Sequence, residues 1–265
     1  MVITTPSGLL AAPKQRAVLQ KTVARTSIAA LPFSVIDLAG NPGAGTLAGT
    51  SVTAGVVPTD ATAGFPVIDA FGGAATGYVT RFEFANTVAS RLTVYDLLFK
   101  AGAYAFNAAQ TLAAQPSYST RVPGGTDFKG TEIWIEAVTV FTGNLSVAVT
   151  YTNQDGTAAR TTGTIATGIA PTVGRMIRLP LQAGDTGVQK IETVTATVAT
   201  VGTFNVLVLR QFAGGRVPIA NGGDVYGPDR TGMPVVFADS ALFLVVTPDS
   251  TSTGNPECII EVANG

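Results

Sequence analysis

Apolar and polar side chains alternate along residues 76–85 with a period of two. In an extended chain Tyr78, Thr80, Phe82 and Phe84 point to one side. The other side then carries Val79, Arg81 and Glu83. This alternation is typical of a β-strand with one buried face.

The same pattern recurs further along the chain. Residues 131–141 and 145–152 alternate clearly, and the Thr-Gly-Asn sequence at 142–144 predicts a hairpin turn between them. The Asp-Gly step within residues 153–156 predicts a second hairpin. Residues 92–99 are apolar and β-prone, although a helix is an alternative there. Further strands are expected at residues 156–166, 176–181, 189–200, 203–212, 235–237, 241–247 and 257–262.

These segments amount to about ten strands separated by turn residues, with no long amphipathic helix between them. Thr and Val alternate repeatedly, as in residues 193–198, and β-branched side chains suit a pleated sheet. Many short strands without crossover helices predict an all-β protein. We expect a two-sheet, jelly-roll-like β-sandwich over residues 76–265, preceded by an extended N-terminal arm.

Residues 1–75 differ from the rest of the chain. Residues 1–30 hold four basic side chains and no acidic one, whereas the other 235 residues hold 12 basic and 17 acidic ones. Pro13 could begin a short helix. We expect this basic arm to contact another subunit or an acidic surface, with a solvated tail as the alternative. Residues 38–75 are rich in Gly, Ala, Thr and Pro, which predicts extended chain or a loop laid over a surface. The candidate inter-subunit contacts are Lys14, Arg16, Lys21 and Arg25.

The composition excludes several kinds of chemistry. The 265 residues include no histidine, which removes Ser-His-Asp and Cys-His catalysis and imidazole-based zinc sites. The single cysteine, Cys258, cannot form a disulfide within the chain, and its strand context predicts a buried apolar side chain. No metal and no cofactor is expected. Catalysis would have to use carboxylates, Lys, Tyr or a carboxylate-bound metal.

The chain is poor in charge. Charged residues make up 12% of it, against a usual share of roughly 25%, and the formal net charge is −1. Such a composition suits a protein whose surface is covered by partners. The near-zero net charge gives no basic surface for nucleic acid. The sequence has no apolar run of about 18 residues that would predict a membrane span, and its N-terminus does not show the pattern of a secretory signal.

Three groups of side chains could carry chemistry. Glu132, Trp134 and Glu136 fall on one face of a predicted strand, and two carboxylates beside an aromatic ring are what glycoside hydrolysis needs. The alternative is that these carboxylates form salt bridges to the next strand. Asp224 and Asp229 lie in a turn-rich loop that could hold calcium, although both are ordinary turn residues. A third group would bind an anion if sheet pairing brought its members together, with surface salt bridges as the alternative: Arg175, Arg178, Arg210 and Arg216.

Five short phrases of the sequence resemble structural proteins of tailed bacteriophages. They are Arg81–Asn86, Tyr95–Tyr104, Arg121–Asp127, Val149–Gly156 and Leu179–Val188. The resemblance covers about residues 75–210 and includes no catalytic motif. It implies a virion component, most naturally of the head.

The leading hypothesis is a capsid decoration, or cement, protein that binds the major capsid protein and other copies of itself as a homo-oligomer. It would be located in the virion, assembled in the host bacterial cytoplasm, with no nucleic acid or membrane partner and no enzymatic activity. One alternative is a tail or baseplate component that recognises a host glycan, and another is a carboxylate glycosidase. A major capsid protein is a weaker candidate because the sequence lacks a long spine helix.

The last two strands are expected to close the fold. Residues 241–247 are apolar at nearly every position, which predicts a buried central strand with Phe243 in the core. Residues 257–262 then return antiparallel, with Cys258 and Ile260 on one face and Ile259 and Glu261 on the other.

Overall fold

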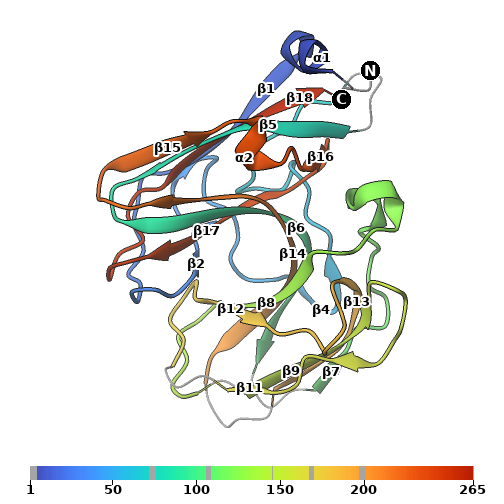
Figure 1. Ribbon diagram of the computed structural model, residues 1–265. Helices are drawn as coiled ribbons and strands as arrows, with labels where there is room; N and C mark the ends of the chain where they lie inside the picture. The colour runs from blue at the N-terminus through green and yellow to red at the C-terminus, as the bar shows by residue number, and fades with distance from the viewer. Residues whose placement is uncertain are drawn as a thin grey trace.

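The computed structural model describes residues 5–71, 76–105, 109–144, 146–166, 170–196 and 201–264. In this part of the chain nearly all regular structure is β, which confirms the predicted all-β sandwich class. The strands form three antiparallel sheets rather than the expected two, and Figure 1 shows them as an upper, a middle and a lower sheet. The short helical elements are α1 (Pro6–Ala11), α2 (Pro228–Thr231), η1 (Ser119–Arg121) and η2 (Pro123–Gly125).

Each sheet takes strands from distant parts of the chain. Across the upper sheet the order is β15 (Gly222–Tyr226), β5 (Thr76–Asn86), β18 (Glu257–Asn264), β1 (Lys14–Lys21) and β3 (Gly40–Asn41), with β16 (Val235–Phe237) also paired to β5. The middle sheet contains β12 (Met176–Leu179), β8 (Thr131–Ala137), β14 (Thr203–Val217), β6 (Ser90–Ala105), β17 (Leu242–Pro248) and β2 (Phe33–Ser34), with β4 (Ser51–Val56) paired to β6. The lower sheet contains β10 (Arg160–Thr161), β9 (Ser146–Asn153), β13 (Val188–Ala196) and β7 (Ala109–Thr111), with β11 (Ile165–Ala166) paired to β9.

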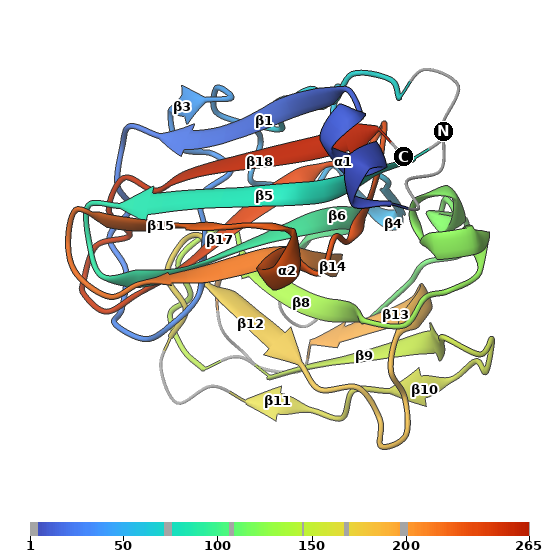
Figure 2. The same cartoon turned by 45° about the horizontal axis from the view of Figure 1, so that its top comes forward.

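Two apolar cores share the middle sheet. Its central strands β6 and β14 are long enough to face the upper sheet at one end and the lower sheet at the other (Figures 1 and 2). On β6, Leu92 and Val94 belong to the core under the upper sheet, whereas Leu98 and Phe99 belong to the core over the lower sheet. The molecule is therefore two sandwiches joined through one common sheet.

The first predicted strand, β5, alternates only in part. Phe82 and Phe84 are buried in the upper core, as predicted. Tyr78, expected on the same face, is half-buried, and Val79 is buried instead. A register shift opposite Glu261 and Val262 of β18 reverses the alternation at this point, because a β-bulge adds one residue to one strand only.

The N-terminal segment is part of the sandwich, so the expected arm and the domain boundary at residue 75 are wrong for the described residues. β1 pairs with β18, and Ala17 and Leu19 are buried in the upper core. The helix lies at Pro6–Ala11, before Pro13 rather than after it. Burial at every second position, Ala17, Leu19 and Lys21, is the pattern of a strand, and tertiary pairing determines its conformation.

The chain changes sheets where one of the predicted hairpins was placed. β8 lies in the middle sheet and β9 in the lower sheet, so residues 142–144 form a connection between sheets and not a hairpin turn. The hairpin predicted at residues 153–156 is confirmed, since β9 and β10 pair antiparallel. The strand expected at 156–166 is reduced to the two short strands β10 and β11, and residues 92–99 are strand.

The last strands also lie in different sheets. β17 belongs to the middle sheet and Phe243 is 1% exposed, which confirms its expected core position. β18 crosses to the upper sheet, where Cys258 and Ile260 are fully buried as predicted. Burial raises the pKa of the Cys258 thiol, in keeping with an inert core side chain.

Residues 36–65, here called the covering segment, run from the upper sheet, where β3 pairs with β1, to the middle sheet, where β4 pairs with β6, and parts of the segment cover the outer face of the middle sheet. Ile36, Leu47 and Phe65 pack there with sheet residues such as Leu97 and Phe243. This arrangement agrees with the expected loop laid over a surface. Gly49 permits the close approach, because a Cβ at this position would lie 2.8 Å from the carbonyl carbon of Gly102.

Candidate functional site

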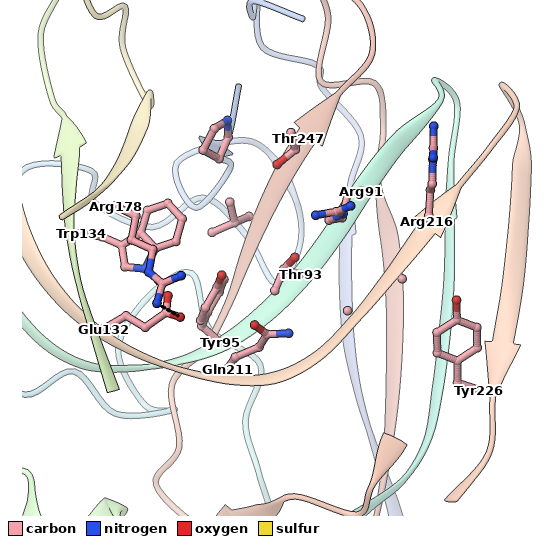
Figure 3. Close-up of a pocket in the computed structure, with 14 residues that line it drawn as sticks. Arg91, Thr93, Tyr95, Glu132, Trp134, Arg178, Gln211, Arg216, Tyr226 and Thr247 are labelled. Atoms are coloured by element: carbon pink, nitrogen blue, oxygen red, sulfur yellow. Dashed lines mark hydrogen bonds and ion pairs between the residues drawn. The ribbon is translucent and has the colours of Figure 1, made fainter. Parts of the chain in front are cut away.

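Beyond the covering segment, the same outer face of the middle sheet is open and hollowed. The groove has a volume of about 520 Å³ and is lined by side chains from five neighbouring strands (Figure 3). β6 contributes Arg91, Thr93 and Tyr95, one at every second position, because alternate residues of a strand share a face. β8, β12, β14 and β17 contribute Glu132 and Trp134, Arg178, Gln211 and Arg216, and Thr247, respectively.

One end of the groove is held by a set of direct contacts. Trp134 donates its indole N–H to Glu132 at 2.8 Å, and Arg178 forms a salt bridge with the same carboxylate at 3.0 Å. The rings of Trp134 and Tyr95 meet edge to face, with centroids 5.9 Å apart. The aromatic pair is thereby fixed in the floor, while the Arg178 side chain is 60% exposed at the rim.

Tyr95 is buried except at the groove. The residue is 6% exposed, and burial, followed by the nearby Glu132 charge, raises the pKa of its phenol. Among the described residues no hydrogen-bond partner of its hydroxyl is present, and Figure 3 shows that hydroxyl directed into the hollow. A neutral phenol in this position can both donate and accept a hydrogen bond.

The two carboxylates of the predicted glycosidase pair do not open to one cavity. Glu132 lines the groove, but Glu136 is completely buried beneath the covering segment. There it accepts a hydrogen bond from Asn205 at 2.7 Å and lies 3.8 Å from the ammonium of Lys100. Glu136 therefore serves a buried polar network, and Glu132 has the salt bridge to the next strand that was the alternative interpretation.

The four candidate anion-binding arginines are divided between two environments. Arg178 and Arg216 both line the groove, where Arg91 joins them. Arg210 is buried near Asp96, and Arg175 donates to the carbonyl of Met176. The alternation of residues 91, 93 and 95 was the signal that could have identified Arg91.

The other sequence candidates lie outside the groove. Asp224 is 3.6 Å from Arg230, and no cluster of three or more potential metal ligands is present in the described part of the chain. Lys21, expected in an arm contact, is buried and donates to the carbonyls of Leu38 and Pro42. Burial lowers the pKa of its ammonium.

The remaining basic candidates behave differently from one another. Arg25 forms an ion pair with Asp37 of its own chain. Lys14 and Arg16 stay exposed, and Arg16 lies 3.9 Å from Glu261. Only these two are left accessible to another subunit, so the four residues do not form one contact surface.

Sequence reasoning missed a buried ionic cluster between the two cores. Asp96 accepts hydrogen bonds from Ser240 and from the backbone of Ala241 and forms an ion pair with Arg121. Arg121 also donates to the carbonyl of Pro58 in the covering segment. Asp96 and Arg121 are both 0% exposed. No local pattern predicts this cluster, because its members are brought together only by the tertiary fold.

Comparisons with known proteins add no family. No protein-family model and no curated protein matches the chain. Solved structures with some likeness include a subviral particle of infectious bursal disease virus VP2, at 11% identity over 95% of this chain and 79% of that chain, with a TM-score of 0.20. The Gx strain of the same virus gives 10% identity over 95% and 80%, with a TM-score of 0.17. At such scores the likeness carries no argument about fold or function.

The helices in the described ranges are all too short or too polar to cross a membrane. What the structure defines is an all-β sandwich protein with a polar groove on its middle sheet.

Proposed function

We propose that the protein is a structural component of a tailed-phage virion, and specifically a decoration protein that binds the major capsid shell and stabilises the head. The phage resemblance of residues 75–210 suggests this class. The observation that carries the proposal is the placement of charge in the folded chain. No catalytic role is proposed.

The few charged residues are partly used inside the molecule. Six of them are buried, which leaves the surface still poorer in charge than the composition: Lys21, Asp96, Lys100, Arg121, Glu136 and Arg210. Depletion of charge is the compositional mark of the central part of a protein interface. A surface of this kind suits a subunit that is covered by its neighbours.

The outer face of the lower sheet is the surface we propose to contact the shell. The strands β9 and β13 bury Val149 and Val194 on their inner side. On their outer side they present a row of small uncharged side chains, all half-buried: Ser146, Ala148, Thr150, Thr193 and Thr195. Glu192 lies at one end of this row, where its carboxylate accepts hydrogen bonds from Thr152 and from the backbone of Ala159. The row itself can approach a second protein without the cost of desolvating a charge.

The proposed partners are the major capsid protein and further copies of this chain, within a virion assembled in the host bacterial cytoplasm. Lys14 and Arg16 remain the candidate contacts to a neighbouring copy, since both are exposed at one edge of the upper sheet.

Charge introduced on the lower face tests the shell contact. Ala148→Lys places an ammonium in the middle of the row, and we expect the folded protein to lose attachment to particles. Val225→Lys on β15, 46% exposed in the other half of the molecule, is the matched control and keeps attachment. Equal attachment of both variants, with unchanged melting, would show that this face is not the contact.

The groove favours a second candidate function, recognition of a host glycan by a tail or baseplate component. A hollow lined by hydrogen-bonding side chains and aromatic rings is the kind of site that holds a polar ligand. Copy number separates the two roles, because a decoration protein is present in hundreds of copies and a tail-tip component in a handful.

A further inference from the structure

We propose that the groove on the middle sheet binds an acidic glycan, a polysaccharide chain that carries carboxylate groups such as those of uronic acids. The inference concerns the site itself and is independent of whether the protein sits on the head or the tail.

The floor of the groove offers hydrogen-bonding groups that the protein leaves unused. Within the described ranges, the hydroxyls of Thr93, Tyr95 and Thr247 and the amide of Gln211 have no hydrogen-bond partner. Tyr95 is more than nine-tenths buried, so its free hydroxyl can be satisfied only from the groove. Hydroxyl and amide groups both donate and accept, which matches the hydroxyls of a sugar ring.

The rim of the groove sets the charge of the ligand. Arg91, Arg178 and Arg216 surround the hollow, against the single carboxylate of Glu132. Glu132 is already engaged by Arg178 and Trp134, while Arg216 lies 3.8 Å from Asp249, an exposed and weak pair. Guanidinium groups bind carboxylates in two-pronged geometry, so an anionic ligand is favoured over a neutral one.

The shape and lining argue for a glycan rather than a peptide. The groove is open to solvent across five strands, which allows a chain to pass through it. Beside the rings of Tyr95, Trp134 and Tyr226, its aliphatic lining residues are Val245 and Pro32, so the apolar side chains of a peptide would find few aliphatic contacts there. Gly214 keeps the floor deep, and a Cβ there would meet only ordinary contacts of 3.4 Å or more.

The chain provides its own reporter for the test. Trp134 is the only tryptophan, and it lies in the groove, so ligand binding can be followed by intrinsic fluorescence. The native protein is titrated with oligomers of galacturonate, of mannuronate and guluronate, and of neutral galactan. We expect saturable fluorescence changes with at least one of the acidic oligomers and binding at least about tenfold weaker with the neutral one.

Variants locate the binding. Arg91→Gln and Arg216→Gln should each weaken the acidic oligomer about tenfold. Arg81→Gln on the upper sheet, 42% exposed and paired with Glu83, is the matched control and should leave binding unchanged. Gly214→Gln should block the groove while melting stays near that of the native protein, because the position has room for a side chain.

Three results would overturn the proposal. The first is no saturable response to any acidic oligomer, and the second is a response that survives all three groove variants. The third is equal or tighter binding of an oligoglutamate peptide, which would make the groove a docking site for an acidic protein segment.

Discussion

The outer face of the middle sheet has two halves that share strands but differ in chemistry. One half lies under the covering segment and is apolar, with Leu97 and Phe243 as typical members. The other half is the groove, where the same strands β6 and β17 present Thr93 and Thr247. The same hydrogen-bonded strands therefore run through both halves. The half with apolar side chains is covered by the protein's own chain, and the half with polar side chains stays open to solvent.

The covered half shows what is needed to bury irregular chain. Carbonyls of the covering segment are satisfied by polar side chains rising from the sheet. Lys100 donates to Thr46 at 2.9 Å, and Asn205 donates to Leu47 at 2.7 Å. In the open half, the hydroxyls of Thr93, Tyr95 and Thr247 have no hydrogen-bond partner among the described residues, which is the expected difference between an internal interface and a surface open to solvent.

The largest effect is expected from the buried ionic cluster beside the covering segment. Arg121→Met removes the closer of the two arginines that face the buried Asp96 and leaves only Arg210, 3.7 Å away, so it should lower the free energy of unfolding by about 3–5 kcal/mol. The identical substitution Arg178→Met in the open half should cost less than about 1 kcal/mol, because that pair is partly exposed. Urea unfolding of the two variants measures the contrast, and equal losses would refute it.

A second prediction concerns the apolar part of the covered half. Phe243→Ala should lower the free energy of unfolding by about 3–5 kcal/mol, since the ring is 1% exposed and packed in the outer cluster. Thermal melting of the free protein gives the answer. Unchanged melting together with weaker particle attachment would instead make Phe243 an interface anchor.

The fit of the covering segment can be tested through its glycines. Gly55 has a φ of +70°, and a Cβ there would lie 2.2 Å from the Phe99 ring, so Gly55→Ala should destabilise by about 1–3 kcal/mol. Gly43→Ala is the control in the same segment, because nothing lies within 4 Å of a Cβ there. Limited proteolysis should cut the covering segment faster in the first variant only.

An ion pair in the lower half of the molecule provides a pH-dependent comparison with these buried contacts. Hydrogen bonds from Arg160, Asn153 and Tyr151 lower the pKa of Asp185 to about 2. The ionised Asp185 carboxylate contributes fully to the free energy of unfolding above the unfolded pKa of about 3.9, and this contribution is lost as the pH falls toward 2. The stability gap between the native protein and Asp185→Asn should therefore shrink over this pH range in acid titrations. A gap that stays constant or widens would contradict the assignment.

The smallest effect on stability is expected in the open half. Tyr95→Phe removes a hydroxyl that has no partner among the described residues, so the free energy of unfolding should change by no more than about 0.5 kcal/mol. The same variant should bind the acidic oligomers more weakly. A large loss of stability would mean that the hydroxyl has a structural role and that the floor of the groove is not free.

The sequence was informative where alternation is local and uninformative where tertiary pairing decides. The existence of strand β5 and the burial of Cys258 follow from a period of two, and the burial of Phe243 follows from the apolar run at residues 241–247. The change of sheet at residues 142–144 does not, because a turn sequence does not reveal which strand its neighbours will pair with.

The site could be predicted only in parts. Glu132 and Trp134 were identified together because they share a strand face, and Arg178 and Arg216 were identified as separate arginines. Their meeting with Tyr95 and Gln211 depends on the order β12-β8-β14-β6-β17, which no local pattern contains. For the same reason the basic N-terminal residues were placed in an arm, although Lys21 is enclosed by its own chain.

The number of copies of this chain in purified particles tests the central claim most directly. A head decoration protein should co-purify with full and empty heads in hundreds of copies, measured by quantitative mass spectrometry against the major capsid protein. Loss of this signal in Ala148→Lys but not in Val225→Lys would place the contact on the lower sheet. Absence from heads, or a handful of copies confined to tails, would contradict the decoration role.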